Sequence, residues 1–165
     1  MRVELASLVG KAVQEVRAFP GALAHPAWID ELTTPIVTSA AFIQLSDGQL
    51  VRVDPCEVES RTGGYPDLGL SLTAVGADAL RKDLGNTKSL FAQRVGAVAP
   101  VLPFEILSAE ESDPLVDRGA IEFRLGARNG DFLILRHIMP PMTLGIEVRR
   151  GVHAPNKSLE RTREG

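Results

Sequence analysis

The chain has 165 residues, of which 44% are hydrophobic and 24% are charged, a composition typical of a folded domain rather than of a disordered or fibrous protein. Its net charge of −3 argues against a nucleic-acid partner, because such binding needs a basic face that neutralises phosphates. Charges interrupt the N-terminal stretch, and no apolar run reaches the roughly 18 residues that suggest a membrane span. We therefore expect a cytoplasmic protein that does not cross a membrane.

Four apolar residues near the N-terminus recur at the spacing typical of one face of a helix: Leu5, Val9, Val13 and Val16. Gly10 interrupts this pattern and weakens a helix at that point. Either one helix runs to about Phe19, or a short helix ends at Gly10 and residues 11–19 continue as a strand. We favour the second alternative, because a later stretch follows the same plan.

That later stretch begins with a helix after Asn86 or Thr87, either of which is a plausible N-cap. Gly96 is the expected end of this helix. Pro100 and Pro103 then forbid an ordinary helix, so an extended segment is expected to follow.

The stretch AFIQLSDGQLVRV reads as a β-hairpin whose register depends on its turn. A two-residue Asp-Gly turn mixes polar and apolar side chains on both faces. With Ser46-Asp47-Gly48 as a three-residue loop and a left-handed glycine, Ile43 instead faces Val51 and Ala41 faces Val53. This register gives one consistently apolar face.

A second hairpin in AIEFRLGARNGDFLILRHI repeats the construction. Its loop is Arg128-Asn129-Gly130, which pairs Leu125 with Leu133 and Phe123 with Leu135. Each hairpin precedes a further strand with alternating apolar residues, LGLSL in the first half and LGIEV in the second.

These correspondences predict an α+β fold with two similar antiparallel β units from an internal duplication. The halves span about 1–75 and 86–150, and short helices in a connector at 76–95 join them. One sheet, a sandwich and a partly closed barrel remain open. We expect a single globular domain over residues 1–150 and a polar tail over 151–165.

Common catalytic and metal-binding motifs are absent from the sequence, and we expect no cofactor and no metal. Cys56 is the only cysteine and has acidic neighbours, so we interpret it as a structural thiol. If the protein is an enzyme, His137 and Asp54 are the catalytic candidates, although a structural histidine at the sheet margin is the preferred interpretation. Arg52 and Arg136 are candidates for binding an anionic or polar ligand if an approximate two-fold relates the halves. The alternative, a solvated sheet face, is the preferred interpretation.

Two loops are further candidates for a binding surface. The insert FPGALAHPAWIDELTTP contains His25, and Pro26 fits the first turn of a short helix that carries Trp28. This helix is either a lid or, as we favour, an amphipathic element anchored in the core by Trp28. The loop RTGGYPD presents Tyr65, and the acidic run around Glu110 is most simply an exposed loop.

The C-terminal stretch APNKSLERTR resembles the endings of proteins encoded on integron gene cassettes, and this resemblance implies a mobile bacterial gene. For the rest of the chain, the leading interpretation is a non-catalytic binding or protein-interaction module. We expect self-association, because partner subunits often cover the exposed sheet edges of small folds. The alternative is a small-molecule binding protein or hydrolase with a pocket between the two halves.

Overall fold

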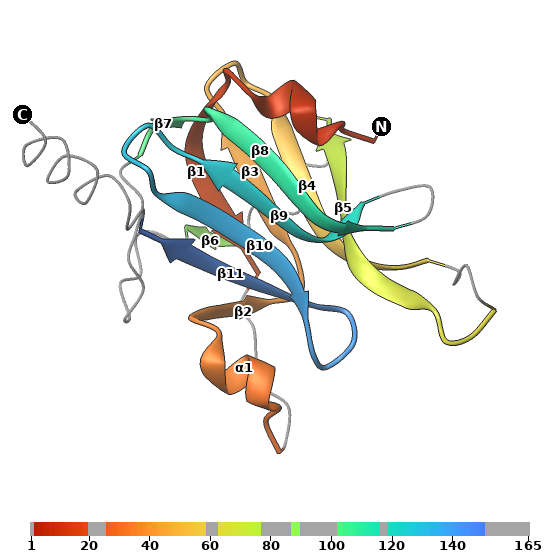
Figure 1. Ribbon diagram of the computed structural model, residues 1–165. Coiled ribbons are helices and arrows are strands. Elements are labelled where there is room, and N and C mark those ends of the chain that lie inside the picture. The colour runs from red at the N-terminus through yellow and green to blue at the C-terminus, as the bar shows by residue number, and fades with distance from the viewer. Residues whose placement is uncertain are drawn as a thin grey trace, which may run out of the picture.

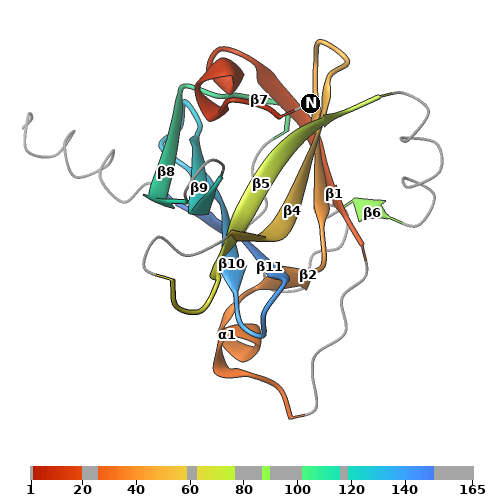
Figure 2. The same ribbon diagram turned by 90° about the vertical axis from the view of Figure 1, so that its right-hand side faces the viewer.

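The computed structural model describes residues 2–19, 26–58, 63–76, 87–89, 102–115 and 119–150. These residues form a mostly β structure, in which one antiparallel sheet curls into a half-barrel (Figures 1 and 2). Helical structure in this part of the chain is limited to a 3-10 turn, η1 (Leu5–Leu8), and a short helix, α1 (Ile29–Thr33). The expected α+β balance is therefore wrong for the described residues. Of the alternatives left open, one sheet curled partway to a barrel is correct.

Nine strands follow one another across the sheet in the order β2-β11-β10-β9-β5-β4-β3-β1-β6, while β7 pairs with β1 and β8 pairs with β9. Their bounds are β1 (Ala12–Ala18), β2 (Ile36–Thr38), β3 (Ala41–Leu45), β4 (Leu50–Val58), β5 (Asp67–Val75), β6 (Lys88–Ser89), β7 (Phe104–Glu105), β8 (Ser108–Pro114), β9 (Ala120–Gly126), β10 (Phe132–Ile138) and β11 (Thr143–Arg149).

The N-terminal stretch is a short helical turn followed by a strand, as expected. Gly10 separates η1 from β1 and has a φ of +89°, in the left-handed region that glycine adopts readily. Its N–H donates to the Ile106 carbonyl at 2.8 Å, and the Ile106 N–H donates to the Lys11 carbonyl at 2.8 Å. The start of β1 is thereby attached to a segment about 95 positions later in the chain.

Both hairpin registers are confirmed. In the β3–β4 hairpin, Ile43 lies opposite Val51, and in the β9–β10 hairpin, Leu125 lies opposite Leu133. The apolar sides of both hairpins enter a single buried core. Its larger members include Leu8, Val16, Ile43, Leu45, Val51, Val53, Leu70, Phe123, Leu125, Leu133, Leu135 and Ile146.

The two turns also share their hydrogen bonds. Gly48 and Gly130 have φ values of +89° and +88°, and each N–H donates to the carbonyl three residues earlier at 3.0 Å. In the first turn, the Asp47 carboxylate accepts the N–H of the residue two positions on, at 2.9 Å. Asn129 accepts the corresponding N–H in the second turn at 3.0 Å. This is the glycine-bulge turn that the sequence predicts.

Two four-stranded antiparallel units meet at the centre of the sheet. The first has the order β1-β3-β4-β5 and the second the order β8-β9-β10-β11. They join where Leu70 of β5 pairs with Ala120 of β9. Gly119 precedes β9 with a φ of +67°, and a Cβ on it would lie 1.9 Å from the Leu70 carbonyl oxygen. The junction therefore requires glycine at this position.

The structure corrects two predictions of secondary structure. The acidic run Glu110-Glu111 lies in β8 rather than in a loop, because its backbone pairs with β9 while its side chains stay exposed. Lys88–Ser89 forms strand β6 against β1 instead of the first turn of a helix. Most of the expected connector 76–95 and the tail 151–165 lie outside the described residues.

Candidate functional site

The most unusual surface lies on α1, whose burial is the reverse of that expected for a core helix. Trp28, Ile29 and Leu32 are 46%, 76% and 66% exposed, whereas Glu31 is only 5% exposed. The prediction that Trp28 anchors this element in the core is therefore wrong. We call the surface formed by Trp28, Ile29 and Leu32 the α1 apolar face. In Figure 1, α1 projects below the curled sheet.

Hydrogen bonds explain why the acidic residues of α1, and not its apolar ones, face the protein. The Glu31 carboxylate accepts the Trp28 N–H at 2.9 Å, which satisfies a backbone donor at the helix start. The Asp30 carboxylate accepts the Met139 N–H at 3.0 Å, a contact that spans 109 positions in the sequence. A helix of five residues has little stability of its own, so these contacts fix how α1 presents its apolar face.

His137 lies beside this attachment point, at the end of β10. By strand alternation it shares the core-facing side of Leu135, and it is buried. Its Nε2 accepts the Met142 N–H at 3.0 Å, so the other ring nitrogen carries the proton of the neutral form. Burial lowers the pKa of His137 below 6.5, while the nearby Asp30 carboxylate partly opposes that shift. These contacts give the ring a structural role in the β10–β11 turn.

Asp54 and Arg52 are on β4, on the opposite side of the sheet from the core. The Arg52 Nε–H is shared between both Asp54 carboxylate oxygens, at 2.8 and 2.9 Å. The Arg52 guanidinium also lies over the rings of Phe19 and Phe42, at 5.8 and 5.4 Å from their centroids. The structure therefore does not bring Asp54 to His137 as a catalytic pair, because each faces a different side of the sheet and has a different partner.

Arg136 and Arg52 do not occupy equivalent positions in the two hairpins. Arg52 follows its turn glycine by four residues, whereas Arg136 follows Gly130 by six. Arg136 is exposed and lines a cavity of about 160 Å³ between α1 and the β10–β11 ladder. Tyr65, the remaining predicted binding residue, is 95% exposed and far along the chain from these groups. His25 lies outside the described residues.

In the described part of the chain, two further cavities lie elsewhere on the sheet. One, of about 160 Å³, is at the junction of the two units and lies between the N-terminal segment, β5 and β9, with Leu72 and Phe123 among its lining residues. The other, of about 260 Å³, lies beside β7 and the β9–β10 turn, where Arg128 forms a 3.1 Å ion pair with Glu105.

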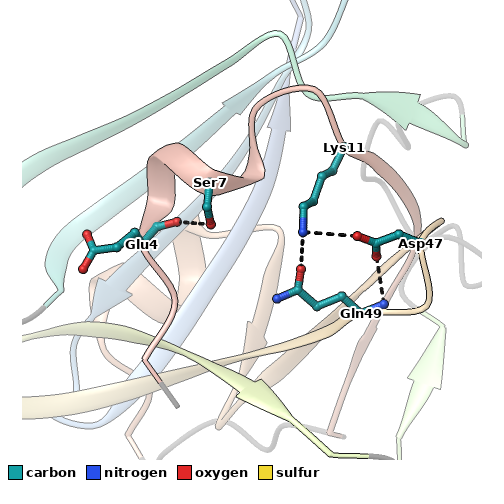
Figure 3. A network of polar contacts seen from close by, with 5 residues as sticks. All are labelled: Glu4, Ser7, Lys11, Asp47 and Gln49. Atoms are coloured by element: carbon teal, nitrogen blue, oxygen red, sulfur yellow. Dashed lines mark hydrogen bonds and ion pairs between the residues drawn. The ribbon is translucent and has the colours of Figure 1, made fainter.

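A polar network at the tip of the first hairpin is structural (Figure 3). The Lys11 ammonium contacts the Asp47 carboxylate at 3.1 Å and the Gln49 side-chain oxygen at 2.5 Å. These contacts connect the hairpin tip to the start of β1. Nearby, the Ser7 hydroxyl donates to the Glu4 carbonyl at 2.6 Å within η1.

Within the described ranges, no group of three or more His, Cys, Asp or Glu side chains is arranged to hold a metal ion. The same part of the chain has no helix with the length and hydrophobicity needed to span a bilayer. Cys56, the only cysteine of the sequence, is buried on β4.

No family model matches the chain, and it has no significant match among curated proteins or solved structures.

Sequence reasoning missed which side of α1 is exposed and which side chains surround Arg136. Thr33, Thr34 and Glu147 line the same cavity as Arg136, although they come from the insert and from β11. The signal for Arg136 is nevertheless in the sequence, because Ile134 and Ile138 occupy the positions two residues away on either side. Side chains at those positions share its face of the strand, and neither can pair with a cation.

Proposed function

We propose that the protein is a non-catalytic interaction module that self-associates through the α1 apolar face. The observation that carries this proposal is the reversed burial of α1, which exposes Trp28, Ile29 and Leu32 while it buries Glu31. Contiguous exposed apolar side chains typically mark a contact surface, and aromatic residues are enriched in such surfaces. The structural contacts of His137 and Asp54 support the non-catalytic part of the proposal.

A second copy of the chain is the occupant that this surface suits best. The α1 apolar face contains no charged side chain, so two copies related by a two-fold axis can meet without bringing like charges together. Three partly exposed side chains bury at most a few hundred Å² per subunit, below the roughly 800 Å² per partner of a standard interface. We therefore expect a weak, reversible dimer with a Kd of roughly 1 μM to 1 mM.

The edge of the sheet at β8 is a poorer contact. β8 is not part of the main strand path, and its residues Glu110, Glu111 and Asp113 are exposed. Acidic side chains and the terminal Pro114 disfavour pairing of this edge with a copy of itself. Self-association through α1 therefore replaces the sheet-edge contact that the sequence alone suggested.

Solution mass measured across a range of protein concentrations tests the proposal. Ile29→Ser and Leu32→Ser, singly and together, should shift the monomer–dimer equilibrium toward monomer by at least about tenfold, because each removes apolar area from the contact. Tyr65→Ser, which removes another exposed apolar side chain outside the α1 apolar face, is the matched control and should leave the equilibrium unchanged. A wild-type protein that remains monomeric at millimolar concentration would contradict the proposal.

A small-molecule binding function is the second candidate. The cavity between β5 and β9 supports it, because it lies at the junction of the two units, where the sequence interpretation placed a pocket. His137 and Asp54 are absent from its lining, so a hydrolase that uses them is not favoured. A metabolite that stabilises a monomeric protein in a thermal-shift screen would favour this candidate over self-association.

We also propose that the two units arose by duplication. The shared turn geometry and the matching strand orders of the two units support this proposal. The cassette-like tail supports the further proposal of a mobile bacterial gene.

A further inference from the structure

Arginines on the outer, solvent-facing side of the sheet follow a pairing rule. Each of four arginines forms an ion pair with a carboxylate two residues away in its own strand, where the two side chains share one face. The pairs are Glu15–Arg17 at 3.4 Å, Arg52–Asp54 at 2.8 Å, Glu122–Arg124 at 2.7 Å and Glu147–Arg149 at 2.6 Å. Carboxylates within single strands therefore neutralise these guanidinium groups.

Arg136 is the exception to this rule. Ile134 and Ile138 occupy both neighbouring positions on its face of β10, and both are buried. Across the sheet, Arg136 pairs in register with Glu122 of β9 and Gly145 of β11, but the Glu122 carboxylate is engaged by Arg124. In the part of the chain that the structure describes, no hydrogen bond or ion pair engages the Arg136 side chain.

The side chain of Arg136 lines a cavity at Gly145, where neighbouring side chains pack closely against the β11 backbone. A Cβ on Gly145 would lie 2.9 Å from the Thr34 methyl carbon and 2.9 Å from a methyl carbon of Ile138, so glycine allows the segment after α1 to approach the sheet. The resulting cavity of about 160 Å³ has room for about five water molecules, at roughly 30 Å³ each. It therefore suits a small ligand rather than a cofactor.

The charges around the cavity favour a singly charged anion. Arg136, Arg149 and Glu147 line it, and the ion pair between Glu147 and Arg149 leaves one net positive charge on Arg136. A planar guanidinium matches the two oxygens of a carboxylate through paired N–H donors. The Thr34 hydroxyl, which makes no hydrogen bond within the described residues, is a further donor at the cavity wall.

We propose that this cavity binds a small carboxylate through Arg136. The cavity does not include the α1 apolar face, so carboxylate binding can be tested independently of self-association. The ligand is a free carboxylic acid small enough for the cavity, for which acetate and benzoate are suitable probes. Inorganic phosphate is the competing anion class, because it carries more negative charge at neutral pH.

Amide chemical shifts followed during titration with acetate and benzoate, at constant ionic strength, test the proposal. We expect saturable shifts that centre on Gly145 and Arg136. Arg136→Gln should weaken binding by at least about tenfold, because it removes a charge-assisted donor pair. Arg128→Gln makes the same change in net charge at an exposed arginine outside the cavity and should alter affinity by less than about twofold.

Glu147→Gln gives a gain-of-function counterpart. It releases Arg149 and raises the positive charge of the cavity, so carboxylates should bind several-fold more tightly. The proposal is overturned by the absence of saturable shifts in the wild type, by unchanged binding to Arg136→Gln, or by an equal loss in Arg128→Gln. Stronger binding of phosphate than of both carboxylates would overturn the assignment of the ligand class.

Discussion

At the scale of single residues, Asp47 and Asn129 have the same role in two separate turns. Each side chain accepts the N–H of the residue two positions on, so its hydrogen bond spans the glycine of the turn. Asp47 differs in also pairing with Lys11, which connects the turn to β1. The Gln49 N–H and the Lys11 ammonium hold the pKa of Asp47 below 3.8.

Two substitutions of Asp47 separate these contributions. In Asp47→Asn, the new amide can accept the Gln49 N–H just as Asn129 accepts the corresponding N–H in the second turn. Only the exposed ion pair with Lys11 is lost, so the melting temperature should fall slightly. Asp47→Ala loses both contacts and should lower it more. Because the carboxylate has a lowered pKa in the folded state, its contribution is present above pH 3.8 and is lost as the pH falls below that value. Equal melting temperatures for the two variants above this pH would contradict the account.

His137 makes stability depend on pH near neutrality. Its folded pKa lies below 6.5, so the unfolded chain takes up its proton first as the pH falls, and stability decreases from about pH 6.5 downward. Protonation also removes the acceptor that binds the Met142 N–H. The His137→Gln variant keeps a hydrogen-bond acceptor at this position but does not titrate. Its melting temperature, measured by thermal unfolding, should therefore depend less on pH than that of the wild type. The same pH dependence in both proteins would exclude His137 as its source.

At the scale of elements, the junction of β5 and β9 depends on backbone contact that a side chain would block. Gly119 combines a left-handed φ with a position against the Leu70 carbonyl oxygen, whereas Gly48 has a left-handed φ in open space. Substitution of Gly48 by alanine therefore tests conformational strain alone. Substitution of Gly119 tests strain together with the close approach of two strands.

We expect Gly48→Ala to lower the free energy of unfolding by about 1 kcal/mol. Gly119→Ala should lower it by at least about 3 kcal/mol, because the backbone must also move apart at the junction. Denaturant unfolding measures both values. Similar losses for the two variants would show that the β5–β9 contact contributes little beyond glycine conformation.

The elements also differ in how far the sequence could predict them. The hairpins were predictable to the residue, because a turn with Asp-Gly or Asn-Gly and a consistent apolar face allow one register. β8 was not predictable, since its exposed acidic side chains lack the alternation that indicates a half-buried strand. The orientation of α1 was mispredicted because the contact from Asp30 to Met139 is long-range and outweighs the apolar preference of Trp28.

At the scale of the whole molecule, one buried core unites two four-stranded antiparallel units, and the candidate binding surfaces lie outside it. The prediction of a core from periodicity succeeded because strand alternation is a local property. The candidate site could be predicted only in part: Arg136 and Trp28 were identified, but their neighbours depend on how α1 meets β11. That packing brings together segments about 110 positions apart, so no local pattern reports it.

The central claim is that the α1 apolar face is exposed in the monomer and covered on self-association. Trp28 is the only tryptophan of the chain, so its fluorescence reports on this face alone. We predict that dilute protein shows the red-shifted emission of a solvent-accessible indole that is readily quenched by iodide. As concentration rises through the dimerisation range, emission should move to shorter wavelength and quenching should fall. Blue-shifted, protected emission at every dilution, or unchanged accessibility where the measured mass is that of a dimer, would contradict the claim.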